Sequence, residues 1–105
     1  MTYYAHVVDV QAPAAVYDAT HAELLRRTAG HVEGLVVHLC RVTEGGFQVV
    51  EVWTDRAAFE RAEREHIAQI LAEQAAAASG APLSPPRTEE FAVRGLVVPA
   101  SGILT

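Results

Sequence analysis

GLVVHLCRVTEGGFQVVEVWTDRAAF, residues 34–59, is the stretch of sequence that decides the fold. Residues 34–43 and 46–54 are rich in β-branched and aromatic side chains, which is typical of β-strands. Glu44-Gly45-Gly46 lies between them and indicates a hairpin, because glycine adopts positive φ angles without steric cost. The centre of the chain therefore predicts two neighbouring antiparallel strands.

The segments on either side of this hairpin complete an alternating order of strands and helices. We expect a strand at residues 3–10, a helix at 13–29 that Gly30 ends, a second helix from a cap at Thr54 or Asp55 to about Ala78, and a fourth strand at 88–98. This is the ferredoxin-like β-α-β-β-α-β order, an α+β fold in which two helices cover one face of an antiparallel four-stranded sheet. The length of 105 residues predicts one domain, with a core over about residues 3–98.

Strands two, three and four of this sheet carry apolar residues on both faces, as strand two illustrates. Its two faces read Leu35, Val37 and Leu39 on one side, and Val36, Cys40 and Val42 on the other. An antiparallel sheet with helices on one face usually alternates cleanly, because its other face meets water. We therefore expect the second face to be covered by another subunit, which predicts a homodimer.

Charge and cysteine content exclude several classes of function. The chain has 13 acidic and 8 basic residues and a net charge of −5, so we expect no nucleic-acid partner. The single cysteine excludes an intrachain disulfide and a cysteine-based zinc site, and no histidine spacing predicts a metal site. The sequence has no signal peptide and no apolar run long enough for a membrane span, so we expect a cytoplasmic protein that has no membrane partner.

His66 is a candidate general base on the second predicted helix. It lies on the apolar side of that helix, between Phe59 and Ile70, and helical geometry would aim it at the sheet. Imidazole is suited to this role because it exchanges a proton near neutral pH. The alternative is a core or interface histidine that is bonded to a backbone carbonyl.

A cross-strand pair is the second candidate. If the hairpin pairs Val42 with Phe47, His38 lies directly opposite Glu51 on the neighbouring strand. A carboxylate beside an imidazole fixes its tautomer, which is the geometry of a general base with an orienting partner. The alternative is a structural pair inside the barrel of a dimer, and the sequence does not say which sheet face carries it.

Further side chains are candidates for contact with a ligand near the same cavity. The register that pairs His38 with Glu51 also places Trp53 opposite Val36 on the same face. His6 lies on the first strand, which neighbours the third, and either sheet face is open to it. The candidates for substrate binding are Trp53, Tyr17, His21, Phe59 and His6.

Residues 34–59 also carry a resemblance to a known family. The stretch combines a buried strand, a Gly-Gly hairpin, a strand that ends in Val52-Trp53, an acidic cap, and Phe59 six residues after the tryptophan. It resembles the antibiotic biosynthesis monooxygenase-like group of the dimeric α+β barrel superfamily, and the order of elements extends the likeness over residues 3–98. The resemblance implies two subunits joined sheet to sheet, each with a pocket between its sheet and its helices.

This resemblance implies cofactor-independent oxygenation of a small apolar or aromatic, polyketide-like metabolite, with a histidine as general base. Other members of the group degrade haem, cyclise polyketides or isomerise lactones. Haem-degrading members pair a helix tryptophan with a histidine ten residues later, whereas this chain has no tryptophan after Trp53. Members with a histidine nine residues after the strand-ending tryptophan would place it at Ala62, so no catalytic residue transfers directly. A cyclase or isomerase in the same pocket and a non-catalytic ligand-binding dimer are the alternatives.

Overall fold

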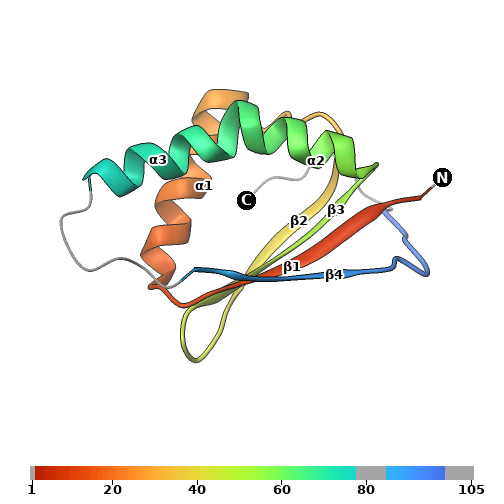
Figure 1. The fold of residues 1–105 in the computed structure, drawn as a ribbon, viewed down its shortest axis with the longest axis horizontal. Helices are drawn as coiled ribbons and strands as arrows, with labels where there is room; N and C mark the ends of the chain where they lie inside the picture. Colours follow the sequence, from red (N-terminus) through yellow and green to blue (C-terminus); the bar gives the residue numbers. More distant parts are fainter. Residues whose placement is uncertain (1, 78–84, 99–105) are drawn as a thin grey trace.

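The computed structural model describes residues 2–77 and 85–98, and it has the expected β-α-β-β-α-β order (Figure 1). The second helical segment is divided into three consecutive parts, α2, η1 and α3. The elements are β1 (Tyr4–Val10), α1 (Ala14–Thr28), β2 (Leu35–Val42), β3 (Phe47–Trp53), α2 (Arg56–Ala62), η1 (Glu63–Ile67), α3 (Ala68–Ala77) and β4 (Arg87–Phe91).

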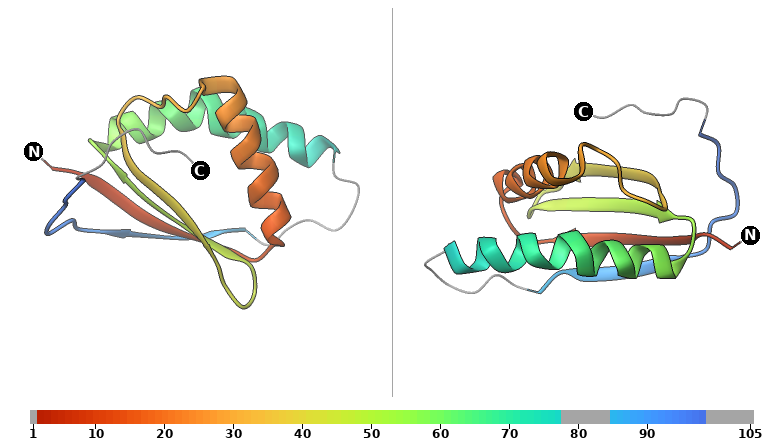
Figure 2. Two further views of the ribbon diagram at one scale, coloured as in Figure 1. Left: turned by 180° about the vertical axis from the view of Figure 1, so that it is seen from behind. Right: turned by 90° about the horizontal axis from the view of Figure 1, so that it is seen from above.

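The four strands form one antiparallel sheet in the order β2-β3-β1-β4. All the helices lie on the same face of this sheet, with α1 over the β2 side and α3 over the β1 and β4 side (Figures 1 and 2). The α+β ferredoxin-like fold predicted from the sequence is therefore confirmed. Its core, under α2, is built on Trp53, Ala58 and Ala62.

The hairpin between β2 and β3 has the predicted register, because Val42 lies opposite Phe47. The two glycines of the hairpin, Gly45 and Gly46, do not have the positive φ angles that were expected of them. Positive φ angles occur instead at Gly30 and Gly34. A Cβ atom on Gly46 would lie 2.0 Å from a backbone carbonyl oxygen of β1. Glycine is required there for close approach of the chain rather than for its φ angle.

The register of β2 changes at the end away from the hairpin. A β-bulge lies between Leu35 and Val37, so that Trp53 lies opposite Leu35 and not opposite Val36 as predicted. A bulge places two residues of one strand against one residue of the other, and this shifts all pairs beyond it. The prediction for Val36 is therefore wrong, while the pairs nearer the hairpin keep the expected register.

The ends of the helices follow local capping chemistry. Asp55 is the cap of α2, where its carboxylate accepts a hydrogen bond from the Ala58 amide at 2.7 Å. Helix α1 starts after Pro13 and ends at Thr28, and its cap is Ala29, whose left-handed φ of 54° comes one residue before the expected stop at Gly30. The expected end of the second helix, Ala78, lies outside the described residues.

The second helix is interrupted by η1, a single turn of π-helix that contains His66. A π-helical turn holds more residues than an α-helical turn, so the side-chain spacing on one face changes across it. Ile70 is fully buried beyond this turn, while its neighbour Leu71 is half exposed. The apolar face predicted from a regular 100° spacing is therefore not continuous.

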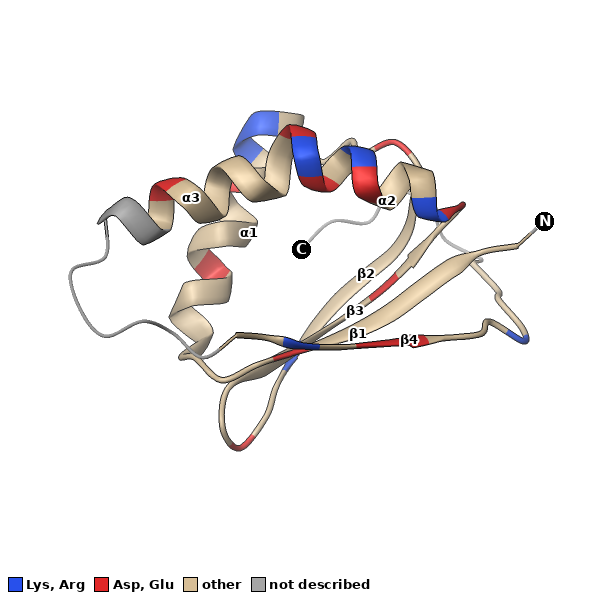
Figure 3. Ribbon diagram, in the orientation of Figure 1, with Lys and Arg blue, Asp and Glu red and all other residues tan. Residues whose placement is uncertain are grey.

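Strand β4 is shorter and more polar than predicted. It covers Arg87–Phe91 instead of residues 88–98, and all five of its side chains are exposed. Its last pair joins Phe91 to Ala5, one residue from the start of β1, so the chain beyond it has no strand to pair with. Figure 3 marks the charged residues of this edge strand in blue and red along the ribbon, and the expected apolar pattern on both faces is wrong here.

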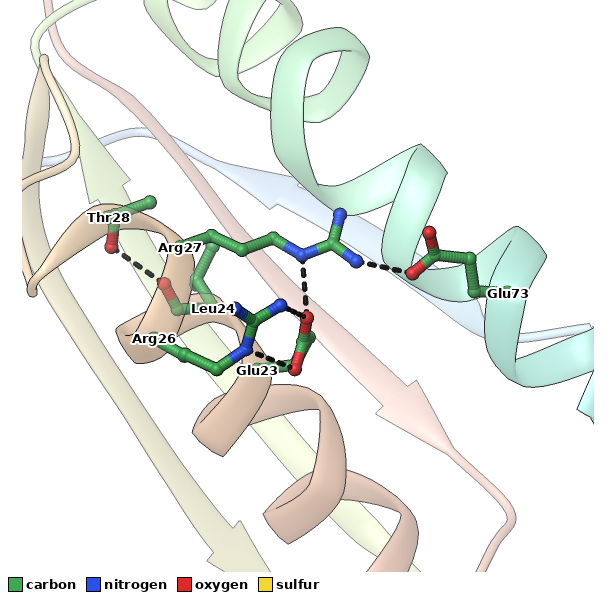
Figure 4. Close-up of polar contacts among 6 residues, drawn as sticks. All are labelled: Glu23, Leu24, Arg26, Arg27, Thr28 and Glu73. Carbon is green, nitrogen blue, oxygen red and sulfur yellow. Dashed lines mark hydrogen bonds and ion pairs between the residues drawn. The ribbon is translucent and has the colours of Figure 1, made fainter.

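Helix α1 has no fully buried residue and is joined to α3 by polar contacts. Arg27 lies between the carboxylates of Glu23 on its own helix and Glu73 on α3 (Figure 4). The Thr20 hydroxyl donates a hydrogen bond to the side-chain oxygen of Gln74 at 2.8 Å. The two helices therefore meet through side-chain hydrogen bonds, and α1 leaves space between itself and the sheet.

Candidate functional site

The candidate site is a row of three polar side chains that crosses three neighbouring strands. Glu51 on the inner strand β3 lies opposite His6 of β1 and opposite His38 of β2. His6 Nε2 is 2.9 Å from Glu51 Oε1, and His38 Nδ1 is 2.7 Å from Glu51 Oε2. The predicted pair of His38 and Glu51 is therefore formed, and it faces the helices, because Tyr17 of α1 and Phe59 of α2 contact the two imidazoles.

Glu51 is held as a buried carboxylate by donors on both of its oxygens. Besides the two imidazoles, Trp53 Nε1 donates to Glu51 Oε1 at 3.2 Å, and the glutamate side chain is 15% exposed. Burial by itself would raise the pKa of Glu51, but the hydrogen bonds from His38 and His6 outweigh it and lower that pKa to about 2. The carboxylate is therefore ionised at neutral pH.

Tyr17 connects this row to the space under α1. Its hydroxyl is 2.7 Å from His38 Nε2 and 3.2 Å from His21 Nδ1, one helical turn further along α1. The three rings are nearly parallel, with interplanar angles of 9–19°. Burial, followed by the charges of Cys40, Glu51 and Asp18, raises the pKa of Tyr17 to about 12, so its hydroxyl stays protonated.

An open cleft of about 620 Å³ lies beside these three rings, between α1 and β2. Its walls combine a polar end with aliphatic side chains, which suits a small apolar ligand that carries a few polar groups. The residues that line it are Tyr17, Asp18, His21, Leu24, Leu25, Thr28, Gly30, Val32, Leu35, Val36, His38, Leu39 and Cys40.

Three of the eight candidate residues line this cleft, namely Tyr17, His21 and His38. Glu51 stands directly behind His38. His6 and Trp53 are buried next to Glu51, and Phe59 packs against both. His6, Trp53 and Phe59 were predicted to bind substrate, but they pack behind Glu51 and do not line the cleft.

His66 lies apart from this row. It borders a separate hollow of about 190 Å³, together with His31 and Arg61 among others. His66 lies within the π-helical turn and not in the regular helix from which its direction was predicted. The structure therefore brings His38 and Glu51 together, and leaves the third predicted catalytic residue elsewhere.

Sequence reasoning passed over several polar residues of the cleft and one residue that supports the site. Asp18 and Cys40 line the cleft near Tyr17, and Tyr4 has its hydroxyl 3.3 Å from His6 Nδ1. Two of them had a usable signal. Cys40 shares a strand face with His38, two residues away, and Tyr4 shares one with His6. For Asp18 the sequence gave no such signal, because no predicted strand partner or site residue other than its neighbour Tyr17 pointed to it.

Within residues 2–77 and 85–98, no three His, Cys, Asp or Glu side chains come together in a way that could hold a metal ion. Over the same part of the chain, no helix has the length and apolar character that crossing a membrane requires.

Comparison with known proteins identifies solved structures with the same architecture. No family model and no curated protein matches the chain. NE2512, a protein of unknown function from Nitrosomonas europaea, superposes with a TM-score of 0.69 at 24% identity, over 96% of this chain and 98% of its own. SnoaB, a cofactor-independent oxygenase from Streptomyces nogalater, has a TM-score of 0.58 at 20% identity, over 90% and 94% of the two chains. A candidate antibiotic biosynthesis monooxygenase from Bacteroides thetaiotaomicron has a TM-score of 0.63 at 11% identity, over 97% of each chain.

The chain has the fold of the antibiotic biosynthesis monooxygenase-like proteins. The resemblance carried by residues 34–59 is thus confirmed at the level of architecture. Identities of 11–24% establish the fold alone, and one fold supports many activities. The activity has to be argued from the cleft and from the side chains behind it.

Proposed function

We propose that this chain is a cofactor-independent oxygenase of a small aromatic or polyketide-like metabolite, with His38 as general base. The observation that carries the proposal is the orientation of His38. Its Nδ1 is held by Glu51 at 2.7 Å, and its Nε2 points to the Tyr17 hydroxyl at the cleft, also at 2.7 Å. An imidazole held in this way by a carboxylate presents the lone pair of its other nitrogen to the substrate side.

The reaction begins with removal of a proton from the bound substrate. Because Tyr17 lines the cleft and its hydroxyl is hydrogen-bonded to His38 Nε2, the substrate proton passes to the Tyr17 oxygen as the tyrosine proton passes to Nε2. The resulting imidazolium lies beside the ionised Glu51, which stabilises its charge. The substrate carbanion then supplies the electrons that form a carbon–oxygen bond to molecular oxygen, and the peroxide anion takes the proton back from His38 through the Tyr17 hydroxyl to give a hydroperoxide. Cleavage of its O–O bond, with loss of the second hydrogen of the same carbon, releases water and leaves a carbonyl group.

The cleft favours a flat, largely apolar substrate with a polar group at one end. Leu24, Leu25 and Val36 belong to its aliphatic walls, and the nearly parallel rings form its polar end. A hydroxyl or carbonyl of the substrate would meet the Tyr17 hydroxyl there. We place the base at His38 and not at His66, because His66 borders a different hollow.

We also propose that the chain acts as a homodimer, joined through the sheet face opposite the helices. That face is apolar around Val37, Val50 and Phe91, and no described helix covers it. Phe91 is 41% exposed there. Native mass spectrometry should give twice the chain mass, and Phe91→Glu should give the monomer. Val42→Glu is the matched control, because Val42 is 72% exposed but lies on the other face.

Oxygen uptake with a panel of hydroxylated polycyclic aromatics tests the activity. We expect uptake with a subset of the panel, and a loss of about 100-fold or more in His38→Gln, the lower end of what general-base catalysis contributes. His31→Gln and His66→Gln are controls, since both side chains border the other hollow, and their uptake should be unchanged. Full turnover without oxygen would point to a cyclase or isomerase instead, and saturable binding without product would point to a binding protein. Either result contradicts the oxygenase.

A further inference from the structure

His6 is the buried polar residue of the described structure, and the proposed reaction does not use it directly. It is 2% exposed and packs edge-on against Phe59 and Tyr4, with ring centroids 4.7 and 5.3 Å apart. Burial of an imidazole is costly unless its nitrogens are hydrogen-bonded. His6 satisfies this condition at both nitrogens, through Glu51 at 2.9 Å and the Tyr4 hydroxyl at 3.3 Å.

The arrangement around Glu51 consists of two similar arms. On the cleft side, a tyrosine hydroxyl bonds to His38 and His38 bonds to one carboxylate oxygen. On the other side, the Tyr4 hydroxyl bonds to His6, which bonds to the second oxygen. All four contacts are satisfied when each neutral imidazole donates one N–H to Glu51 and accepts the tyrosine proton at its other nitrogen. The donors therefore converge on Glu51 from both sides.

This convergence has a consequence for the carboxylate. Because His38 and His6 donate to different oxygens, Glu51 cannot rotate about its terminal bond without losing one of these hydrogen bonds. Without His6, the oxygen Oε1 would keep only the longer bond from Trp53 at 3.2 Å. The carboxylate would then be less firmly directed at His38 Nδ1, and His38 could adopt its other tautomer.

We propose that His6 is a positioning residue of this site, which locks Glu51 so that Glu51 fixes the tautomer of His38. His6 makes no contact with the cleft, so it acts through Glu51 and not on the ligand. The part of this proposal that concerns turnover rests on the proposed function, whereas the part that concerns hydrogen bonding does not.

Nitrogen NMR of the wild-type protein with labelled histidine is the first test. In the neutral form of each imidazole, we expect the proton of His38 on Nδ1 and the proton of His6 on Nε2. The opposite tautomer at either residue would overturn the proposal, without need of any variant.

Two substitutions of His6 then separate its hydrogen bond from its packing. His6→Phe keeps a ring between Tyr4 and Phe59 but removes the donor, and His6→Gln restores an N–H donor without the ring. We expect His38 to become a mixture of tautomers in His6→Phe, the Glu51 pKa to rise from about 2, and both effects to be smaller in His6→Gln. Tyr4→Phe is the control, since it leaves the bond between His6 and Glu51 in place. A single unchanged His38 tautomer in His6→Phe would overturn the proposal.

The kinetic test follows once a substrate is known. His6→Phe should lower kcat by about tenfold or more, part of the contribution of general-base catalysis, with KM within about twofold of the wild type. A raised KM with unchanged kcat would overturn the positioning role, because it would place His6 in ligand binding. If the wild type turns over no substrate, the proposed function fails, and the tautomer experiments still decide the role of His6.

Discussion

Replacement of Glu51 by glutamine should make the stability of the protein less dependent on pH. The ordinary pKa of a glutamate carboxyl is 4.5, and the hydrogen bonds of His38 and His6 hold that of Glu51 at about 2. Each unit of such a shift corresponds to about 1.4 kcal/mol, so ionised Glu51 contributes about 3 kcal/mol at neutral pH. Since folded domains of this size are stable by about 5–15 kcal/mol, the effect is large.

The sign follows from the direction of the shift. The folded-state pKa lies below the unfolded one, so the stabilisation is complete above about pH 5 and is lost as the pH falls toward 2. By pH 3, about 2 kcal/mol of it should be gone. Urea unfolding of the wild type and Glu51→Gln at pH 7 and pH 3 measures this, with the exposed Glu89→Gln as control. An equal stability difference between wild type and Glu51→Gln at both pH values would refute the reasoning.

Three further predictions concern the framework of the site. Gly46→Ala should destabilise the protein by about 3 kcal/mol in thermal unfolding, because its Cβ would lie 2.0 Å from a carbonyl oxygen. Gly95→Ala is the control: its Cβ would meet no atom within 4 Å, so it should change stability by less than about 0.5 kcal/mol. Asp55→Ala should cost about 1 kcal/mol of unfolding free energy in urea, because it removes the cap of α2, and no measurable change would mean that the cap is not needed. A double-mutant cycle of Arg27→Met and Glu73→Gln should give a coupling of less than about 1 kcal/mol, because the Glu73 side chain is 56% exposed, and a larger value would make this contact a main support of α1.

The part of the site that could be predicted from the sequence follows from strand register. Once a short hairpin fixes Val42 opposite Phe47, the period of two along a strand places His38 opposite Glu51. The position of β1 beside β3 in the ferredoxin-like order then makes contact of His6 with Glu51 available, although the sequence left its face open. Strand register can therefore be predicted from the sequence for residues that lie close to a tight turn.

The errors lie where the backbone departs from its regular period. The bulge at Leu35–Val37 and the π-helical turn around His66 each insert a residue into an otherwise regular element. Such insertions depend on tertiary packing, and no local pattern in this sequence predicts them. The shortness of β4 has a different origin, because a strand can extend only as far as its neighbour, and β1 begins at Tyr4.

The choice of residues around Glu51 argues for a chemical role more strongly than for a stabilising one. Replacement of a buried ionic group by well-packed apolar residues is often neutral or stabilising, so the fold itself does not require this glutamate. An inner strand of an apolar sheet nevertheless carries Glu51 between two imidazoles, and only one of these, His38, borders the cleft. A purely structural carboxylate would need only donors that satisfy its oxygens, and it would not matter what the other nitrogen of each imidazole contacts. Here the outer nitrogen of His38 meets the Tyr17 hydroxyl, so the row of polar groups ends at the cleft.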